Sequence, residues 1–410
     1  MTPLRWFVLV ESNTTGSGRR FCAVARRRGL RPVVLAADPG RYPYLAEDGV
    51  DHLTLDTGDQ DAVDAACDRF ARDGVAGVTS SSEYFIAAAA AAAARLGLPG
   101  PSAAAIRECR AKDRQRALLV AGGVAVPAFR VVDGPAGAVD AAGSLGLPVV
   151  VKPVAGSGSV GVRLCATAAE AAEAVAALLA GADERGTARE RRVLVEEFAR
   201  GPEYSVETIG TEVVGVTRKH LGPAPFFVET GHDFPAPLAD AERSAVERTA
   251  VRALRALGLG WGAAHTELRV TRRGPVLIEV NPRLAGGMIT AVVEEAAGID
   301  LVACCVDLAC GRSPALVPTR AAAASIRFLV AERAGPVTAV RGIPAAQGMP
   351  DVRAVTVTVA PGARIGELTQ SFRDRLGHVI TRAGDVARAA AAAESARAAI
   401  VVDQSPPAAG

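Results

Sequence analysis

Apolar runs and helical patterns alternate along the first hundred residues. Residues 6–10 form a five-residue apolar run that predicts a buried strand. Residues 19–28 predict a helix that ends at Gly29, and a second apolar strand follows at residues 32–36. This order of strand, helix and strand is typical of an open parallel sheet. The same pattern continues with strands at 51–55 and 75–79 and helices at 59–72 and 82–96.

A second block of helices and strands follows the break at residues 96–102. Ser102 can cap a helix that runs to about Val120, because Gly122 and Gly123 stop it. Further on, Thr167 and Glu170 have the spacing of a capping box and predict the start of an alanine-rich helix. The elements predicted around it are strands at 129–132 and 193–195 and a helix at 136–145.

A buried strand within this block ends in Lys152 and runs into a loop with glycines at 156, 158 and 161. A lysine in that position can meet phosphate oxygens while the amides of the loop cover them. Because the lysine precedes the glycines, the segment is not a Walker A sequence. Taken alone, the pattern is explained equally well by a plain hairpin loop.

Two short strands, at 265–270 and 275–280, are joined by a turn that contains Gly274. If Arg273 lies near the centre of the turn, antiparallel pairing places Glu267 directly across from Glu279. Facing carboxylates repel each other, so the arrangement makes most sense with a cation between them. Asn281 and Arg283 follow Glu279 at steps of two, so the extended chain turns these side chains to one face. The sequence therefore predicts a site for Mg²⁺ and phosphate rather than a solvated acidic hairpin.

The pattern in the C-terminal part predicts a smaller α+β unit. Asp240 is predicted to cap an amphipathic helix that ends at Leu257, and Asp385 a helix that runs to Ile400. Between them lie predicted helices at 290–298 and 301–310 and strands at 322–329, 337–343 and 352–359.

Composition narrows the class of protein. The 410 residues are 50% hydrophobic, enough for a large core in two to four units. A net charge of +2 and 4% aromatic residues give no reason to expect nucleic acid or an anionic membrane as a partner. The seven cysteines are odd in number and form no CxxC pair, and neither a signal peptide nor a spanning helix is recognisable. We therefore expect a cytoplasmic protein, and leave open a homodimer as the commonest closed symmetry.

Several further charged residues are ambiguous when each is taken singly. Lys112 and Glu203 read as ordinary exposed charges, although Glu203 could accept hydrogen bonds from ribose hydroxyls. Glu196 and Glu197 close a strand where a nucleotide base could meet backbone groups.

The ordered set of these residues resembles the ATP-grasp carboxylate–amine ligases. The resemblance rests on Lys112, on Lys152 before GSGSVGV, on VEEFARGPEYSVE, and on Glu267 and Glu279 followed by Asn281 and Arg283. It implies that nucleotide lies between two α+β subdomains, within an α/β and α+β fold of three parts. The implied parts are an N-terminal open parallel sheet domain (1–108), a two-lobed ATP-grasp domain (109–318, with a small mobile lobe at about 123–195) and a C-terminal α+β lid domain with a short disordered tail (319–410).

The resemblance also implies a role for each matching residue. Lys112 and Lys152 would contact ATP phosphates beneath the loop amides of Ser157 and Gly158. Glu196 and the backbone of Glu197 and Phe198 would meet the adenine, and Glu203 the ribose. Glu267, Glu279 and Asn281 would hold Mg²⁺ or Mn²⁺. Arg283 would stabilise the acyl phosphate and the tetrahedral species, and Lys152 would share in catalysis.

The segment between Gly215 and Leu238, with a loop from Phe226 to Pro237, is expected to select the substrate. Together with NPRLAGGM it resembles the L-amino acid ligase branch, which joins amino acids into dipeptides and related amides. The expected substrate contacts are Phe227, Glu229, His232, Arg283, Gly286 and Gly287.

The expected reaction couples a small-molecule carboxylate to an amine and releases ADP and phosphate. An ATP-dependent carboxylase or another ATP-grasp phosphotransferase would keep the ATP residues and change the substrate loop. A noncatalytic nucleotide-binding protein would be expected to lose one of Glu267, Glu279, Asn281 and Arg283, and all four are present.

Overall fold

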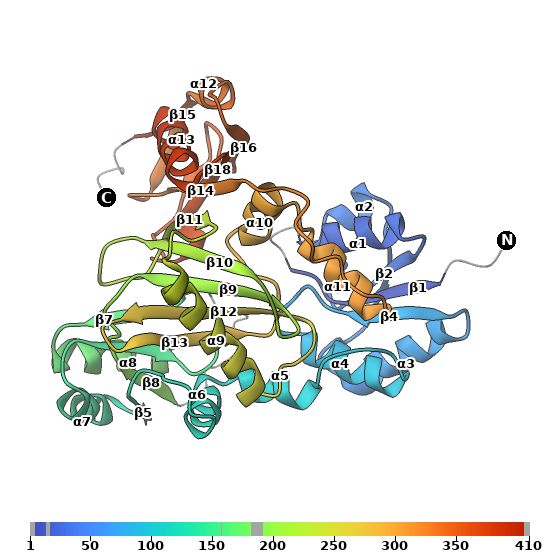
Figure 1. The fold of residues 1–410 in the computed structure, drawn as a ribbon, viewed down its shortest axis with the longest axis horizontal. Helices are drawn as coiled ribbons and strands as arrows, with labels where there is room; N and C mark the ends of the chain where they lie inside the picture. The colour runs from blue at the N-terminus through green and yellow to red at the C-terminus, as the bar shows by residue number, and fades with distance from the viewer. Residues whose placement is uncertain (1–4, 14–16, 157, 182–191, 406–410) are drawn as a thin grey trace.

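The computed structural model describes residues 5–13, 17–156, 158–181 and 192–405. Figure 1 shows the N-terminal domain in blue, the central region in green and yellow, and the C-terminal region in orange and red. No helix among these residues combines the length and apolarity that crossing a membrane requires.

The N-terminal domain is the predicted open parallel sheet. Its strands lie in the order β3-β2-β1-β4, and every pairing is parallel. Helices cover both faces, which explains why three of the four strands are nearly continuous apolar runs, while β3 at the edge is mostly exposed. The elements are β1 (Trp6–Val10), α1 (Ser17–Arg27), β2 (Arg31–Ala36), a 3₁₀ turn (Pro39–Arg41), α2 (Tyr44–Glu47), β3 (Asp51–Thr54), α3 (Gln60–Ala71), β4 (Val75–Thr79) and α4 (Ile86–Arg95).

The small lobe is a four-stranded antiparallel sheet in the order β5-β8-β6-β7. Its elements are β5 (Phe129–Val132), α7 (Pro135–Leu145), β6 (Val149–Pro153), β7 (Arg163–Cys165), α8 (Ala168–Ala180) and β8 (Val193–Glu197). Helices α7 and α8 pack on one face of this sheet over an apolar core. The predicted capping box is confirmed, because the Thr167 hydroxyl accepts from the Glu170 amide while the Glu170 carboxylate accepts from the Thr167 amide.

An eight-stranded antiparallel sheet forms the centre of the molecule, in the order β13-β12-β9-β10-β11-β14-β18-β16. From the central region it takes β9 (Glu203–Ile209), β10 (Glu212–Leu221), β11 (Glu229–Phe234), β12 (Ala263–Thr271) and β13 (Gly274–Asn281), and from the C-terminal region β14 (Ala323–Val330), β16 (Val352–Val357) and β18 (Arg375–Ala383). The sheet therefore runs without interruption across the predicted boundary at residues 318–319.

Two further groups of elements complete the fold. The connecting helices are α5 (Ala103–Arg110), α6 (Lys112–Ala121), α9 (Asp240–Ala256), α10 (Ile289–Ala297) and α11 (Leu301–Ala309). The C-terminal end adds β15 (Gly335–Arg341), α12 (Ile343–Gln347), β17 (Arg364–Ile365), a 3₁₀ turn (Phe372–Asp374), α13 (Val386–Ala399) and β19 (Val401–Gln404). Helix α11 packs beside α1 on the N-terminal sheet, so residues from the central stretch help to complete the first domain.

Three local predictions were wrong. The segment 229–234 is not a loop but strand β11, because its polar residues find partners across the sheet, such as Asp233 with Ser325. The helix predicted from Ser102 is broken at Ala111, whose backbone is extended, and α6 begins anew at Lys112. Asp240 lies inside α9, since Ala239 is the N-cap and has no side-chain bond to offer. Asp385 does cap α13, as predicted.

Candidate functional site

A cavity of about 740 Å³, counted with its open mouth, lies between the small-lobe sheet and the central sheet. This volume is in the range of small-molecule and cofactor sites. Its lining brings together most of the predicted nucleotide residues: Lys112, Lys152, Gly158, Glu196, Glu197, Phe198, Glu203, Glu267 and Glu279. The sequence prediction of one shared site is thus supported by geometry. Ser157 lies outside the described residues.

The hairpin β12–β13 has the predicted register. Glu267 pairs with Glu279, and His265 pairs with Asn281. The protein supplies cations to both carboxylates, since Glu279 Oε1 lies 2.9 Å from Lys112 Nζ and Glu267 Oε1 lies 2.7 Å from Lys219 Nζ. The repulsion that the sequence implied is therefore balanced by lysines.

These oxygen donors fit a hard divalent cation. Two facing carboxylates and a neighbouring amide are the ligands that Mg²⁺ accepts, with water and phosphate oxygens completing its shell. Among the described residues there is no group of three or more His, Cys, Asp or Glu side chains arranged to hold a metal by themselves. A cation at Glu267 and Glu279 would therefore depend on the phosphates of a bound nucleotide as well.

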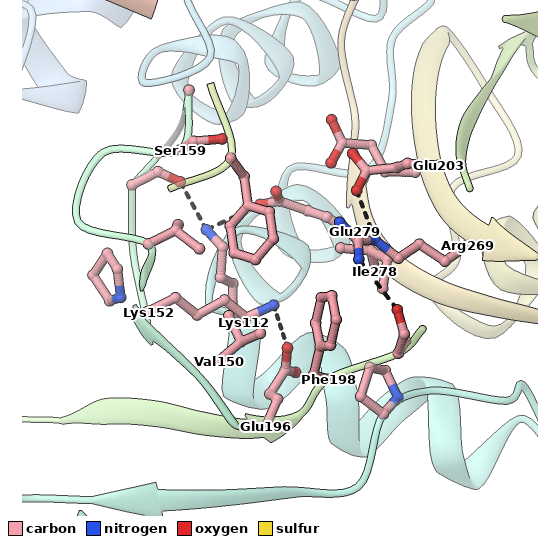
Figure 2. A pocket seen from close by; sticks show the side chains of 18 of the residues that line it. Lys112, Val150, Lys152, Ser159, Glu196, Phe198, Glu203, Arg269, Ile278 and Glu279 are labelled. Carbon is pink, nitrogen blue, oxygen red and sulfur yellow. Dashed lines mark hydrogen bonds and ion pairs between the residues drawn. The ribbon is translucent and has the colours of Figure 1, made fainter. Parts of the chain in front are cut away.

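Lys152 points at Glu196 inside the cavity, with 2.5 Å between Nζ and Oε2 (Figure 2). On the other side, Arg116 Nε lies 2.6 Å from Glu196 Oε1. Burial lowers the pKa of Lys152 to about 8, and neighbouring Arg116 adds to the effect, although Glu196 opposes it. Burial raises the pKa of Glu196, but the two cations outweigh it and the net shift is downward. The carboxylate of Glu196 is thus engaged in a buried ion triad, and its predicted contact with adenine stays a prediction.

Aromatic and cationic side chains form the wall next to this triad. The rings of Phe198 and Phe227 lie 6.2 Å apart, and the Arg269 guanidinium stands 5.0 Å and 5.3 Å from their centroids. Arg269 Nε in turn donates to Glu203 Oε2 over 2.9 Å. Phe227 was predicted as a substrate contact, but the structure places it in this wall of the large cavity. Glu197 reaches Arg273 at 2.7 Å on the outer rim.

Lys219 belongs to this site but was not among the site residues predicted from the sequence. Its ammonium lies within 3.0 Å of three carboxylates, those of Glu203, Glu229 and Glu267. Burial lowers its pKa, but the three carboxylates outweigh burial and raise the pKa well above the ordinary value. The only signal in the sequence is a lysine inside an alternating strand, which does not reveal that three other strands carry its partners.

His232 lies on β11, where it pairs with Lys219 across the β10–β11 ladder. Its side chain is fully buried, and neither ring nitrogen has a hydrogen-bond partner among the described residues. Burial is the main reason that the pKa of His232 falls to about 3, so the imidazole is neutral near pH 7. Glu229 Oε2 lies 3.6 Å from Nε2 and also binds Arg375 Nη2 at 2.6 Å.

Gly287 lies close against His232 and Glu229. Its φ of +57° is a conformation that side chains disfavour, and a Cβ there would come within 2.7 Å of His232 Nε2. Gly286 has open space where a Cβ would stand. The predicted substrate residues Glu229 and His232, on the part of β11 that had been expected to be a loop, are therefore brought together with Gly287 from the segment between β13 and α10.

Arg283 lies two residues beyond the end of β13, away from the turn of the β12–β13 hairpin. Its Nε donates to Glu83 Oε2 of the N-terminal domain over 2.6 Å. Together with Asn281 and Glu279 it lines a second, smaller cavity that also reaches Gly156. Arg283 is therefore held by a residue 200 positions earlier in the chain, which no local pattern could indicate.

Comparisons with known proteins agree with this geometry. Residues 145–292 match the model of the ATP-grasp domain, and residues 327–404 match that of the L-amino acid ligase C-terminal domain 2. The uncharacterized protein y4rH of Sinorhizobium fredii is 40% identical over 374 residues, which cover 91% of this chain and 77% of the relative. Human carnosine synthase 1 is 34% identical over 184 residues, covering 42% of this chain and 22% of that longer protein. The fold resembles the crystal structure of L-amino acid ligase from Bacillus licheniformis, with a TM-score of 0.78, 22% identity, and coverage of 99% of this chain and 100% of that one.

Proposed function

Because the chain belongs to the ATP-grasp carboxylate–amine ligases, ADP-forming enzymes that make carbon–nitrogen bonds, we propose that it joins the carboxylate of an amino acid to the amine of a second small molecule. The product is an amide or a dipeptide. The match to an L-amino acid ligase C-terminal domain supports this choice of substrate, as does the similarity to carnosine synthase 1.

One observation carries the proposal. Lys219 contacts both Glu267, which faces Glu279, and Glu229, which lies beside His232. The place where a carboxylate is activated thus adjoins the place where an amino acid is recognised. A neutral imidazole keeps one nitrogen as an acceptor, so His232 and Glu229 can both accept from a substrate ammonium.

The reaction follows from the charges around the cavity. A carboxylate oxygen of the amino acid attacks the γ-phosphorus of ATP, the bond from that phosphorus to the bridging oxygen breaks, and ADP leaves. The amine nitrogen then adds to the acyl carbon and loses a proton, and the carbon–oxygen bond to phosphate breaks to give the amide and inorganic phosphate. Lys112 and Lys152 hold fixed positive charge where phosphate oxygens gather, and Arg283 does so for the oxyanion of the tetrahedral species. A Mg²⁺ ion held by Glu267, Glu279 and Asn281 would neutralise phosphate charge.

The proposal places the enzyme in the cytoplasm. All seven cysteines are free thiols, five of them buried, which suits a reducing compartment that supplies ATP.

The proposal is tested by screening ADP release over pairs of amino acids and amines, with mass spectrometry of the products. An amide formed in step with ADP supports it, whereas AMP release contradicts an acyl phosphate route. ADP formation with bicarbonate, and with no amino acid, would indicate a carboxylase instead.

The variant Glu279→Ala tests the metal end of the site. Losing one such charge is expected to lower kcat about 10²- to 10³-fold, on the scale of a lost electrostatic contact in a transition state. Glu47→Ala is the matched control, because Glu47 is an exposed carboxylate that contacts Arg19 far from the cavity. Wild-type turnover by a folded Glu279→Ala variant would contradict the metal assignment.

A further inference from the structure

His265 stands in the middle of a buried polar row on the central sheet. Across the β9–β12 and β12–β13 ladders it pairs with Glu207 on one side and Asn281 on the other. The next pairs on the same face are Ser205 with Glu267 and Glu267 with Glu279. His265 therefore lies one step behind the facing carboxylates, on the side away from Glu203.

Both ring nitrogens of His265 are bonded. Nδ1 lies 2.8 Å from Glu207 Oε1, and Nε2 lies 3.0 Å from Glu267 Oε1. Glu207 is oriented in turn by the Ser205 hydroxyl, which donates to the same Oε1 over 2.8 Å. Because His265 and Glu207 are 4% and 3% exposed, water does not compete for these bonds.

The two donors to Glu267 reach the same oxygen. His265 Nε2 and Lys219 Nζ both contact Oε1, at 3.0 Å and 2.7 Å. A carboxylate held through one oxygen has its direction set and its second oxygen, Oε2, left for another ligand. Glu267 lines the large cavity, so that ligand would come from the cavity.

We propose that His265, anchored by Glu207, is a positioning residue that orients Glu267 for the divalent cation. Residues that hold a metal-binding side chain from behind set its direction, and losing one typically lowers metal affinity about 10- to 100-fold. The inference rests on the proposed function only in assigning the cation to Glu267.

Two substitutions at His265 distinguish the contact of Nε2 with Glu267 from the contact of Nδ1 with Glu207. The amide of Gln can stand near Nε2 and still donate to Glu267, whereas the amide of Asn can stand near Nδ1 and reach only Glu207. We expect His265→Asn to weaken Mn²⁺ binding about 10- to 100-fold and His265→Gln to stay within about threefold of wild type. The measurement is the electron paramagnetic resonance signal of free Mn²⁺ titrated into the full chain with ADP, so it does not depend on catalysis.

The controls tell positioning from simple loss of structure. His220→Gln alters another His–carboxylate contact, a partly buried one of 2.6 Å to Asp233, and should leave Mn²⁺ affinity unchanged. Equal losses for His265→Asn and His265→Gln, following their thermal midpoints, would overturn the positioning role. If His265→Asn does not fold, His265→Leu removes the donor to Glu267 instead and should show the same loss, and unchanged affinity in that variant would overturn the role equally.

A separate variant distinguishes this inference from the proposed function. Glu267→Gln should weaken Mn²⁺ binding more than any change at His265. If Glu267→Gln binds Mn²⁺ as the wild type does, the metal assignment itself is wrong. If it binds weakly while His265→Asn binds normally, only the positioning role is overturned.

Discussion

The two ends of the site treat buried polar groups in opposite ways. At the nucleotide end, Glu196 is buried between Arg116 and Lys152, and each oxygen of its carboxylate has a cationic partner. At the substrate end, His232 is equally buried, and its ring nitrogens have no partner among the described residues. A paired buried charge is stable only while the pairing is complete, whereas an unpartnered imidazole costs stability until a ligand arrives. The comparison teaches that the nucleotide end is organised in the protein alone, and it supports our proposal that substrate completes the other end.

The largest expected effect on stability comes from removing one cation from the ion triad at Glu196. Arg116→Met removes one cation from Glu196 at a position that is 0% exposed. Removing one partner of a buried ion pair typically costs about 3 to 5 kcal/mol, so the urea midpoint should fall strongly. Arg341→Met is the control, because Arg341 pairs with Asp403 on the surface and its loss should leave the urea midpoint almost unchanged. An equally small change in Arg116→Met would mean that the triad does not organise this end.

A second expectation concerns how pH acts on the organised end. Below the pKa of about 8, Lys152 already carries its proton and meets ATP as a cation. Above that pH the free enzyme must take up a proton to bind, so ATP affinity should fall by up to about tenfold per pH unit, or about 1.4 kcal/mol. Calorimetric titration of ATP between pH 7 and pH 9 measures the slope.

Lys152→Arg is the control for the pH experiment. A guanidinium stays protonated throughout this range, so its ATP affinity should be flat where that of the wild type declines. The same decline in both proteins would assign the effect to another group.

The smallest expected effect on stability comes from replacing the unpartnered imidazole of His232. His232→Leu replaces two buried unpartnered nitrogens with an apolar group of similar size, so the protein should become more stable by about 1 kcal/mol. At the same time the KM for the amino acid should rise, while the Kd for ATP stays unchanged. Thermal melting measures the change in stability, and steady-state kinetics measure the KM. An unchanged KM in a folded variant would remove His232 from the substrate site.

The sequence predicted those parts of the site that local geometry decides. The pairing of Glu267 with Glu279 was confirmed, but the two-residue turn alone does not set it. The turn pairs Thr271 with Gly274, and a bulge between Glu267 and Leu268 then shifts the register by one residue and brings the two carboxylates opposite each other. The capping box at Thr167 and the parallel sheet of the first domain were also confirmed. Strand β11 was missed because its polar side chains resemble a loop until the partner strands are known.

The sequence by itself determined the inventory of the site, which is a set of lysines, paired carboxylates and a glycine loop in the order that ATP-grasp ligases share. Only the tertiary structure decided how these groups are connected. Lys219 meets Glu203, Glu229 and Glu267 because β9, β10, β11 and β12 lie in one sheet, and Arg283 meets Glu83 because two domains pack together. Spacing along a strand sets which side chains share a face, but the choice of neighbouring strand depends on the packing of the whole chain, and the charges in this site are balanced across strands rather than along them.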